Sequence, residues 1–497
     1  MIDASEERRE FNGWRSGLFK RLLDASAMFA RLDSDLRSNV LPDRSPLQLE
    51  DLASQLESDL RNGDLDKAVQ GLIDGSVHYS HSGYLNQQLN FPVPGAAVGA
   101  LWAAILNQGQ AVFEMAPLTS VIERRMLDWA RDKLRLSRHS FGLSTGGGSL
   151  ANLSALLAGR NKLDDWSTWD TGTGHPIRVL VSEHTHYSIS RAASIVGIGA
   201  RNVVSIETDE RGRINQDALA SALVPGTPTI VCLTFGTTTT GAFDDLGEFL
   251  ARHDKSSRSA WWIHVDAAHG GSFYRLPELQ RQFDALSQVD SVCWDFHKIF
   301  FQSVPLSFLF FKDSPAASFL TGHNSPYLSQ QMVGRYPDMH NWTLECSRTA
   351  NAMKLWVSLH TEGEERLAGD VKHLARRTRD LHDLLLSISA LDVYCLPETN
   401  IICVRLRANS EPASNEATKR LVEFLNGRGI WSVGQVRMRD RLYLKLCLMN
   451  PRITSDGIQR LATEIRRFAA ESAARELATD GGRIGTGQGI YSRGYAK

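Results

Sequence analysis

Two ionisable side chains in the middle of the chain follow apolar runs and could carry chemistry. Asp266 comes directly after the apolar run 261–265, and Lys298 follows the apolar run 291–294 by a few residues. Short apolar runs of this kind indicate buried strands. Because ligands collect at the carboxyl ends of strands in open α/β sheets, we expect Asp266 and Lys298 to reach one cleft.

An aspartate and a lysine on neighbouring strand ends suit pyridoxal 5'-phosphate. This cofactor needs a lysine amine for its Schiff base and a carboxylate that keeps the ring nitrogen protonated, so that the ring can accept electrons. A lone aspartate at a strand end is ordinarily a turn cap, and a lysine is ordinarily a solvated surface residue. Lys298, however, lies between two apolar runs, where burial disfavours the charged amine. A nearby cation would keep Asp266 ionised.

A glycine cluster, 146–148, precedes Ser149 and a segment with a helical pattern. Free backbone N–H groups and the positive end of the helix dipole would bind the cofactor phosphate there, with the Ser149 hydroxyl helping. Gly147, Gly148 and Ser149 are therefore the candidate phosphate ligands. Gly-rich turns are common, so the loop alone is equally consistent with an ordinary turn. The aspartate and lysine elsewhere in the chain favour the phosphate interpretation.

These motifs resemble a known family. The segment DAAHGG, which begins at Asp266, and the pair His297-Lys298 are similar to the group II pyridoxal-phosphate-dependent amino-acid decarboxylases, which include glutamate, aromatic-L-amino-acid and L-2,4-diaminobutyrate decarboxylases. STGGGSLANL similarly resembles the family's S-G-G-T-E-A-N-L phosphate loop. The family motif N-P-H-K differs here, because Asp295 and Phe296 precede His297. The resemblance covers about residues 81–451.

The resemblance implies roles for the residues around the cofactor ring. Lys298 would attach the cofactor covalently, and Asp266 would pair with the ring nitrogen. His186, in HTHYSISRA, would stack on one face of the ring, and Ala268 would pack on the other. His186 alone would more simply be a structural histidine.

The resemblance also implies roles at the edges of the site. His297 would contact the phosphate, and Thr237, in FGTTTTGAFDDL, would lie close to the cofactor, although threonines suit a strand end in any case. The polar segment 323–342 would form a mobile loop whose Tyr327 protonates the substrate carbon after carbon dioxide leaves. Arg348 would lie near the site in an undefined role.

The fold expected is α/β, with the architecture of pyridoxal-phosphate fold type I (aspartate-aminotransferase-like) implied by the resemblance. Alternating strand and helix patterns in 96–365 predict a large domain with a mostly parallel sheet covered by helices on both faces. Its expected strands are 177–182, 202–207, 229–234, 261–265, 291–294 and 306–311. Residues 1–95 show helical patterns at 17–32 and 47–60 and no evident strand.

A third region, 366–480, has the pattern of a small α/β domain, with strands expected at 400–406 and 442–447. The Gly-rich end, 481–497, is expected to be a flexible tail. In the resembling family the N-terminal helical segment wraps over a partner subunit. The resemblance therefore implies a homodimer.

The composition excludes some partners. Lys+Arg of 55 against Asp+Glu of 56 gives a net charge of -1 over 497 residues, so no overall field favours nucleic acid or an anionic membrane. The acidic N-terminus and the absence of a long apolar run predict a soluble, cytoplasmic protein. The 6 cysteines show no C-x-x-C spacing and are expected to be reduced thiols, and no metal is expected.

These patterns predict an amino-acid α-decarboxylase, a carboxy-lyase that releases an amine and carbon dioxide. The sequence WDFHKIFFQ around Lys298 resembles the diaminobutyrate branch more than the N-P-H-K-W of the other branches. A small-molecule substrate of the 2,4-diaminobutyrate type is therefore expected. Two alternatives stay open: a metal-dependent hydrolase with His264, Asp266 and His269 as ligands, and a catalytically silent cofactor-binding homologue.

Overall fold

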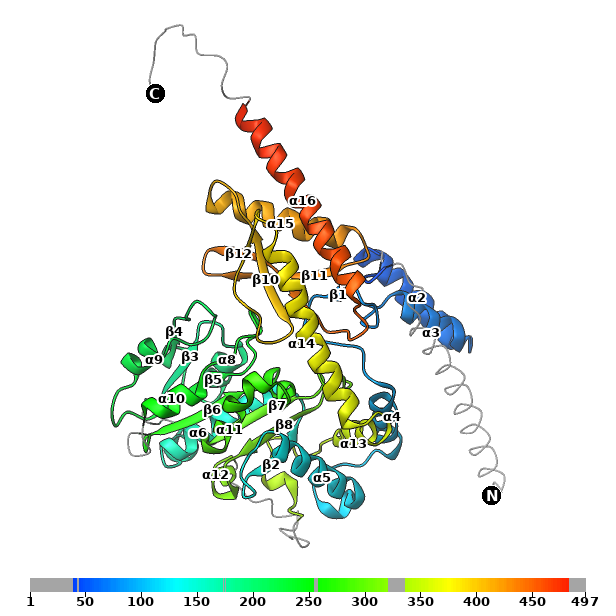
Figure 1. The fold of residues 1–497 in the computed structure, drawn as a ribbon. Helices are drawn as coiled ribbons and strands as arrows, with labels where there is room; N and C mark the ends of the chain where they lie inside the picture. The colour runs from blue at the N-terminus through cyan, green and yellow to red at the C-terminus, as the bar shows by residue number, and fades with distance from the viewer. Residues whose placement is uncertain are drawn as a thin grey trace, which may run out of the picture.

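The computed structural model describes residues 39–42, 44–172, 174, 176–253, 258–320 and 336–481, with side chains described up to residue 472. Two sheets organise these residues, and they lie in the lower and upper parts of the molecule in Figure 1. The larger sheet has seven strands in the order β2-β8-β7-β6-β5-β3-β4. The smaller has five, in the order β1-β11-β12-β10-β9.

The larger sheet is mostly parallel, as predicted. Its strands are β2 (Phe141–Thr145), β3 (Arg178–Ser182), β4 (Val203–Ile206), β5 (Thr229–Thr234), β6 (Trp261–Asp266), β7 (Ser291–Asp295) and β8 (Ser307–Phe311). The pairs from β4 through β7 are parallel, whereas β8 runs antiparallel to both β7 and β2. All six predicted strands of this region form, and β2 is an additional strand. The register aligns Asp266 with Thr234 and Cys293.

Helices cover both faces of this sheet. One face carries α5 (Pro117–Lys133), α10 (Leu246–Arg252) and α11 (Gln280–Ala285), and the other carries α6 (Gly148–Leu163), α8 (Ser188–Ile195) and α12 (Ser314–Ser318). Successive residues of a strand point to opposite faces. On β6, Ile263 and Val265 pack in the first of these cores and Trp262 packs in the second. Asp266 has the parity of Trp262, so its carboxylate faces α6.

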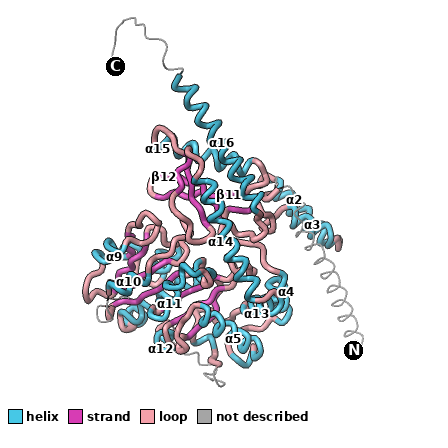
Figure 2. The backbone as a smooth tube through the Cα atoms, in the orientation of Figure 1, coloured by secondary structure: helices cyan, strands magenta, loops and turns pink. Residues whose placement is uncertain are grey.

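The remaining helices surround the two sheets (Figure 2). They are α2 (Pro46–Arg61), α3 (Leu65–Asp74), α4 (Pro94–Leu106), α7 (Ser167–Thr171), α9 (Gln216–Ala222), α13 (Ala352–Thr361), α14 (Glu364–Leu386), α15 (Glu411–Gly427) and α16 (Ser455–Gly481). Short 3-10 turns are η2 (Phe113–Met115), η3 (Ala200–Asn202), η4 (Gly270–Phe273), η5 (Pro277–Leu279), η6 (Leu286–Gln288) and η7 (Met339–Asn341). Within the described residues, every helix is too short or too polar to span a lipid bilayer.

Local sequence explains where two of these helices begin. Ser45 caps α2 by accepting a hydrogen bond from the backbone N–H of Gln48, while the Gln48 side chain accepts from the Ser45 N–H. The helix α6 begins after Gly147, whose φ of 125° is accessible to glycine and strained for other residues. The glycine cluster therefore sets the start of α6, as the sequence predicted.

The smaller sheet consists of β1 (Tyr84–Leu85), β9 (Leu391–Val393), β10 (Ile401–Leu406), β11 (Ser432–Met438) and β12 (Arg441–Cys447). The predicted strands β10 and β12 form. The expectation of no strand in 1–95 was wrong, because Tyr84 pairs with Ser432 and Leu85 with Val433. Two residues have no periodicity to detect, and only their long-range partner defines the strand. The predicted helix 17–32 and most of the tail lie outside the described residues.

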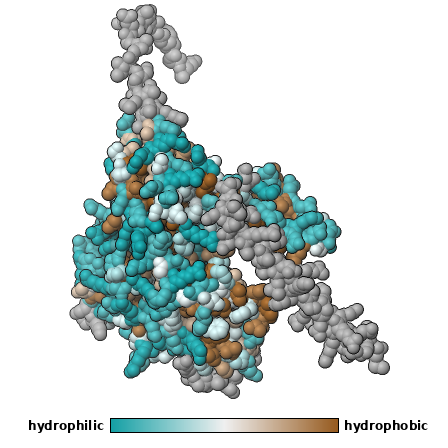
Figure 3. Space-filling view, turned by 45° about the vertical axis from the view of Figure 1, so that its right-hand side comes forward, coloured by the Kyte–Doolittle hydropathy of each residue, from teal (hydrophilic) through white to brown (hydrophobic). Residues whose placement is uncertain are grey.

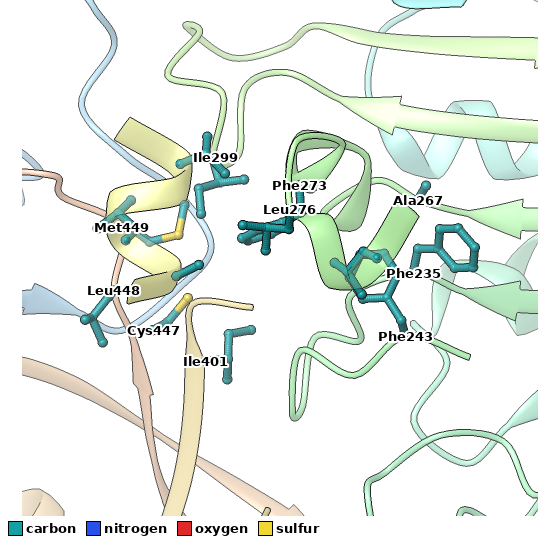
Figure 4. Close-up of a cluster of buried hydrophobic side chains, with 14 of the residues drawn as sticks. Phe235, Phe243, Ala267, Phe273, Leu276, Ile299, Ile401, Cys447, Leu448 and Met449 are labelled. Carbon is teal, nitrogen blue, oxygen red and sulfur yellow. The ribbon is translucent and has the colours of Figure 1, made fainter. Parts of the chain in front are cut away.

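The core is continuous between the two sheets. Figure 4 shows Phe235, Phe273 and Leu276 from the larger sheet and its connections facing Ile401 and Met449 of the small domain. All five belong to one buried cluster. The small domain is therefore packed directly against the connections that follow β5 and β6, where the predicted site residues lie.

Candidate active site

The two predicted strand ends carry buried charges. Asp266 ends β6 and is 5% exposed, and Asp295 ends β7 and is 2% exposed. The turn after β7 brings Lys298 Nζ to 3.3 Å from Asp295 Oδ2. Burial lowers the pKa of Lys298, but the charges of Asp295 and Asp266 outweigh it and raise the pKa above its ordinary value. Lys298 is therefore an ammonium group in this arrangement.

The pKa of Asp266 shifts in the opposite direction from what burial alone would give. Burial raises it, while the charge of Lys298, the proximity of His264 and a hydrogen bond from Asn152 lower it below its usual value. The Ala268 N–H also donates to Asp266 Oδ1, at 3.1 Å. Asp266 is therefore an ionised buried carboxylate, as a partner of a protonated ring nitrogen must be.

Asn152, on α6, holds Asp266 in place. Its Nδ2 donates to Asp266 Oδ2 at 2.8 Å and to Ser188 Oγ at 2.9 Å. Its Oδ1 lies 3.0 Å from His264 Nε2. Because an ionised carboxylate only accepts hydrogen bonds, the amide nitrogen must face Asp266 and the amide oxygen must face His264. His264 then carries its proton on Nε2.

The same network fixes the tautomer of His186. Ser188 Oγ accepts from Asn152 and lies 2.8 Å from His186 Nδ1, and the Ser188 backbone N–H lies 3.3 Å from the same nitrogen. A backbone N–H can only donate, so His186 Nδ1 is the acceptor and the ring proton is on Nε2. Burial lowers the pKa of His186, Asp266 raises it and Lys298 lowers it, with a net decrease. His186 is therefore a neutral imidazole whose N–H is on the side away from Ser188.

His186, Asp266, Lys298 and Asp295 lie close together. The three charged groups come from the ends of β6 and β7 and the turn after β7, and each influences the pKa of His186, which lies just before α8. Ala268, 6% exposed, lies two residues beyond Asp266. The structure thus brings together residues that the sequence predicted around the cofactor ring, and their contact with the ring stays a prediction.

The glycine loop presents free donors. Gly148 and Ser149 are the first residues of α6, and in the described part of the chain their backbone N–H groups have no acceptor. Gly146 and Ser149 are exposed. A 16-residue helix that begins with free N–H groups favours an anion at this end.

His297 lies beside the same region. Its Nδ1 is 3.0 Å from Leu306 O and 3.2 Å from Leu306 N, and its Nε2 is 3.7 Å from Asp295 Oδ2. The contact with Leu306 fixes the ring, and Nε2 remains directed toward the end of β7. Contact with a phosphate stays a prediction.

Thr237 and Arg348 serve the packing around the site. Thr237 is fully buried, and its hydroxyl bonds Thr240 Oγ1 at 2.9 Å inside its own turn. Arg348 donates to Glu123 Oε1 at 3.2 Å and to Ser144 O at 3.1 Å. Since Ser144 lies in β2, Arg348 stabilises the strand that leads to the glycine loop. Tyr327 lies outside the described residues.

A buried lysine that the sequence analysis missed lies near the site. Lys445, on β12, is 5% exposed and forms no ion pair among the residues that the structure describes. Burial, Lys298 and Lys445 together lower the pKa of His269 to about 3, against a hydrogen bond that His269 donates to Asn400 Oδ1, which raises it. His269 therefore lies within reach of both lysine charges. The sequence feature that could have predicted a buried Lys445 is a single lysine within the apolar strand RLYLKLC.

The geometry gives no support for a metal site at His264, Asp266 and His269. Both ring nitrogens of His264 have partners, Ser291 Oγ at 2.9 Å and Asn152 Oδ1 at 3.0 Å. His269 Nε2 contacts Asn400 Oδ1 at 2.7 Å. Across the described ranges, no group of three or more His, Cys, Asp or Glu residues is placed to hold a metal ion.

Comparison with known proteins decides the family. Residues 46–407 match the pyridoxal-dependent decarboxylase conserved domain. The chain belongs to the pyridoxal-dependent decarboxylase family. This decarboxylase is thus a carboxy-lyase that acts on amino acids, and pyridoxal 5'-phosphate is its cofactor. Both were predicted from the sequence and are confirmed.

The names of the relatives of this decarboxylase indicate different substrates. It is 24% identical over 386 residues to an L-2,4-diaminobutyrate decarboxylase of Acinetobacter baumannii, covering 72% of this chain and 74% of that one. It is 27% identical over 445 residues to cysteine sulfinic acid decarboxylase of Rattus norvegicus, covering 85% and 89%. It is 26% identical over 481 residues to 4-hydroxyphenylacetaldehyde synthase of Rhodiola rosea, covering 90% and 91%.

Solved structures share the fold of this decarboxylase. The glutamate decarboxylase domain of a diaminobutyrate-pyruvate transaminase and L-2,4-diaminobutyrate decarboxylase from Vibrio parahaemolyticus gives a TM-score of 0.77 at 22% identity, covering 91% of this chain and 96% of that one. Oryza sativa TDC with PLP and tryptamine gives 0.79 at 22% identity, covering 93% and 98%. These matches confirm the predicted fold type I architecture.

The residues present fit the cofactor. Free N–H groups at the start of α6 suit its phosphate, and the ionised Asp266 suits a protonated ring nitrogen. Lys298 is close enough to Asp266 for each charge to shift the pKa of the other. When bound, pyridoxal 5'-phosphate supplies an electron sink for the pair released as carbon dioxide leaves. The protein then has to orient the ring, hold its nitrogen protonated and deliver a proton to carbon.

Proposed function

We propose that this chain decarboxylates an L-amino acid at the α-carbon, with Lys298 as the covalent attachment point of the cofactor. The observation that carries the proposal is the convergence of His186, Asp266 and Lys298. The charges of Asp266 and Lys298 shift each other's pKa and that of His186, although the three residues are far apart in the sequence.

Each residue around the ring has a separate task in this proposal. Asp266, ionised and held by Asn152, keeps the ring nitrogen protonated. His186 stacks on one face and presents its Nε2–H, and Ala268 packs on the other face. Because His186 is neutral and its pKa is lowered, it acts as a hydrogen-bond donor and not as a charged group.

The phosphate end is formed by the glycine loop. Gly147, Gly148 and Ser149 would bind the phosphate through N–H groups and a hydroxyl, and His297 Nε2 would reach the same group. Thr237 would contribute through the turn that it stabilises. Tyr327 would deliver the proton to the α-carbon after carbon dioxide has left.

Lys445 is suited to the substrate carboxylate. A buried ammonium without an ionic partner in the described residues is costly unless an anion joins it. Lys445 shares the environment of His269 with Lys298, so an amino acid that reaches Lys298 could place its carboxylate there. This assignment requires only one carboxylate on the substrate.

For the substrate we propose a small amino acid with a cationic side chain, of the 2,4-diaminobutyrate type. The residues that flank Lys298 support this assignment, as does the name of one relative. The carboxylates of Asp295 and Glu345 border the glycine loop. An acidic second group, as in cysteine sulfinic acid, would be repelled by these negative charges.

A screen of carbon dioxide release tests the substrate class. The purified protein loaded with pyridoxal 5'-phosphate is incubated with 2,4-diaminobutyrate, ornithine, lysine, cysteine sulfinate, glutamate, tryptophan and DOPA, and the products are identified by mass spectrometry. We expect amine and carbon dioxide in the highest yield from the diamino acid. Strong turnover of DOPA or tryptophan with none of 2,4-diaminobutyrate would refute the substrate assignment, and no release from any amino acid would favour the silent homologue.

We also propose that the chain forms a homodimer through the face that includes α4. This helix exposes Val98, Leu101, Trp102, Ile105 and Leu106, each at least 39% accessible. Brown surface is visible in the lower part of Figure 3, on the side where α4 lies. Exposed apolar area of this kind is typical of protein interfaces.

Analytical ultracentrifugation tests the dimer. The wild-type chain is expected to sediment at twice the mass of 55.2 kDa. The double variant Leu101→Glu, Trp102→Glu places two charges on the apolar face and should shift the protein to a monomer. A charge-matched double variant at exposed positions of the small domain, Leu386→Glu, Leu396→Glu, should leave the dimer intact. A wild-type monomer at micromolar concentration would contradict the proposal.

A further inference from the structure

A carboxylate lies against the first residue of α6, beside the position where the cofactor phosphate is expected. A Cβ atom placed on Gly148 would come 2.7 Å from Asp295 Oδ2 and 2.8 Å from Oδ1. The carboxylate therefore packs directly against the first residue of the helix. The register of the sheet delivers it there, because Asp295 pairs with Ser307 on β8 and Ser307 pairs with Thr145 on β2, just before the glycines.

Three neighbours hold this carboxylate. Ser307 Oγ donates to Asp295 Oδ1 at 2.5 Å. On the other oxygen, Lys298 Nζ lies at 3.3 Å and His297 Nε2 at 3.7 Å. Asp295 is thus a fixed, buried hydrogen-bond acceptor. Its ion-pair partner, Lys298, is the lysine to which the cofactor would become covalently attached.

The start of α6 has groups that attract the cofactor phosphate and a group that repels it. The free N–H groups of Gly148 and Ser149 attract an anion, whereas the Asp295 carboxylate beside them repels one. A second carboxylate adds to the repulsion, since a Cβ atom on Gly146 would come 3.1 Å from Glu345 Oε1. When Lys298 is bound to the cofactor, it no longer offers Asp295 a free ammonium group.

We propose that the Asp295 carboxylate competes with the cofactor phosphate for the start of α6. Cofactor binding then requires Asp295 to leave Gly148 or to lose its negative charge. In the cofactor-free protein Asp295 lies against Gly148 and pairs with Lys298. The ligand that it opposes is a phosphate monoester. This inference rests on the proposed placement of the phosphate at Gly147, Gly148 and Ser149.

Neutralising Asp295 should therefore tighten cofactor binding. The substitution Asp295→Asn keeps the shape and a hydrogen-bond acceptor for Ser307 but removes the charge. Removing a like charge within a few ångströms of a partly buried phosphate is expected to lower the dissociation constant by about tenfold or more. The affinity is measured by titrating cofactor-free protein with pyridoxal 5'-phosphate and following absorbance and tryptophan fluorescence.

Matched variants separate charge from structure. Ser307→Ala removes the donor to Asp295 and keeps the charge, so it should not tighten binding. Asp51→Asn makes the same charge change on exposed α2 and should leave the affinity at the wild-type value. Asp295→Ala, measured beside Asp295→Asn, should change the affinity in the same direction, and it replaces that variant if Asp295→Asn does not fold.

Pyridoxal, which has no phosphate, identifies the group on which Asp295 acts. The proposal requires the gain in Asp295→Asn to be much larger for pyridoxal 5'-phosphate than for pyridoxal. An equal gain for both ligands would show that Asp295 acts through Lys298 alone, and an unchanged or weaker affinity for pyridoxal 5'-phosphate would make Asp295 a support of the site; either result overturns the proposal. A wild-type protein that binds no pyridoxal 5'-phosphate would instead contradict the cofactor assignment.

Discussion

Asn152 Nδ2 donates a hydrogen bond to Asp266 Oδ2 at 2.8 Å, across 114 positions of sequence. The amide is itself fixed, because its oxygen accepts from His264 and its nitrogen also donates to Ser188. One side chain on α6 therefore orients both the carboxylate for the ring nitrogen and, through Ser188, the imidazole of His186. Asn152 is a positioning residue of the site.

Removing this amide should affect both stability and activity. Asn152→Ala leaves the buried Nε2–H of His264 without its acceptor, at a cost of about 1–3 kcal/mol in the free energy of unfolding. Losing a hydrogen bond to charged Asp266 should raise the pKa of that carboxyl and lower kcat/KM by about tenfold or more. Urea unfolding and steady-state kinetics measure the two effects.

A control on the same helix separates these effects. Asn161→Ala also removes a fully buried amide, one that donates to Phe319 O at 2.8 Å, so it should lose stability without changing the absorbance of the bound cofactor. Equal effects of the two variants on the cofactor spectrum and its pH dependence would contradict the positioning role of Asn152.

The lysine assignment has a direct test. Lys298→Ala should fold, because Lys298 is only partly buried, and it should lose covalent cofactor attachment and nearly all turnover. Borohydride reduction followed by peptide mass spectrometry should label Lys298 in the wild type and no residue in the variant. Lys162→Ala, a change at an exposed lysine 3.4 Å from Asp290, should retain both label and activity. Full activity in Lys298→Ala would disprove the assignment.

If Lys445 binds the substrate carboxylate, its removal should change KM more than kcat. Lys445→Gln should raise KM by about tenfold or more, since a charged hydrogen bond is worth about 1.5–3 kcal/mol, with a smaller effect on kcat. The amine product lacks the carboxylate, so its inhibition constant should be unchanged. Lys354→Gln removes another buried lysine, whose Nζ contacts Pro305 O at 3.0 Å, and should lower stability without this selective change in KM. A parallel weakening of amine binding in Lys445→Gln would argue against the role.

Buried histidines should make the protein less stable in mild acid. Burial lowers the pKa of His264 to about 4 and is the main reason that the pKa of His269 falls to about 3. Between these values and the unfolded pKa of about 6.5, the unfolded chain binds protons that the folded chain does not. The free energy of unfolding therefore rises with pH across this range, and the protein becomes less stable as the pH falls.

A variant isolates the contribution of one histidine. His269→Asn should reduce the slope of unfolding free energy against pH by up to about 1.4 kcal/mol per pH unit between pH 4 and 6. Urea unfolding at a series of pH values measures this slope. His139→Asn, at an exposed site, should leave the slope unchanged. A slope identical to wild type in His269→Asn would show that His269 takes up its proton in the folded state.

Tyr327 lies outside the described residues, and its role as proton donor stays a prediction from the sequence. Tyr327→Phe should bind cofactor and substrate and release carbon dioxide, but yield a carbonyl product in place of amine, because the α-carbon lacks its proton source. Molecular oxygen would then accept the electron pair, or the cofactor would take up the proton and leave as its pyridoxamine form. Parallel assays of amine, aldehyde and carbon dioxide measure the partition. Wild-type amine yield from the variant would favour a tyrosine without a catalytic role. One relative is named as an aldehyde synthase, which makes the product assay informative for the wild type as well.

The sequence by itself determined the chemistry and most of the fold. Asp266 and Lys298 were recognisable because each follows a contiguous apolar run, and local runs define buried strands. The glycine cluster before Ser149 predicted the start of α6 for a local reason too, since Gly147 needs a positive φ. These features depend on neighbouring residues and are therefore visible in the order of the chain.

Tertiary structure decided which distant residues act on those groups. Asn152 reaches Asp266, and Lys445 comes near His269, only after the sheet aligns strands far apart in sequence. The same long-range packing placed the Asp295 carboxylate against Gly148, used both nitrogens of His264 in hydrogen bonds, and paired Tyr84 with Ser432. No local pattern encodes such contacts, because each is created by the register and burial of the complete fold.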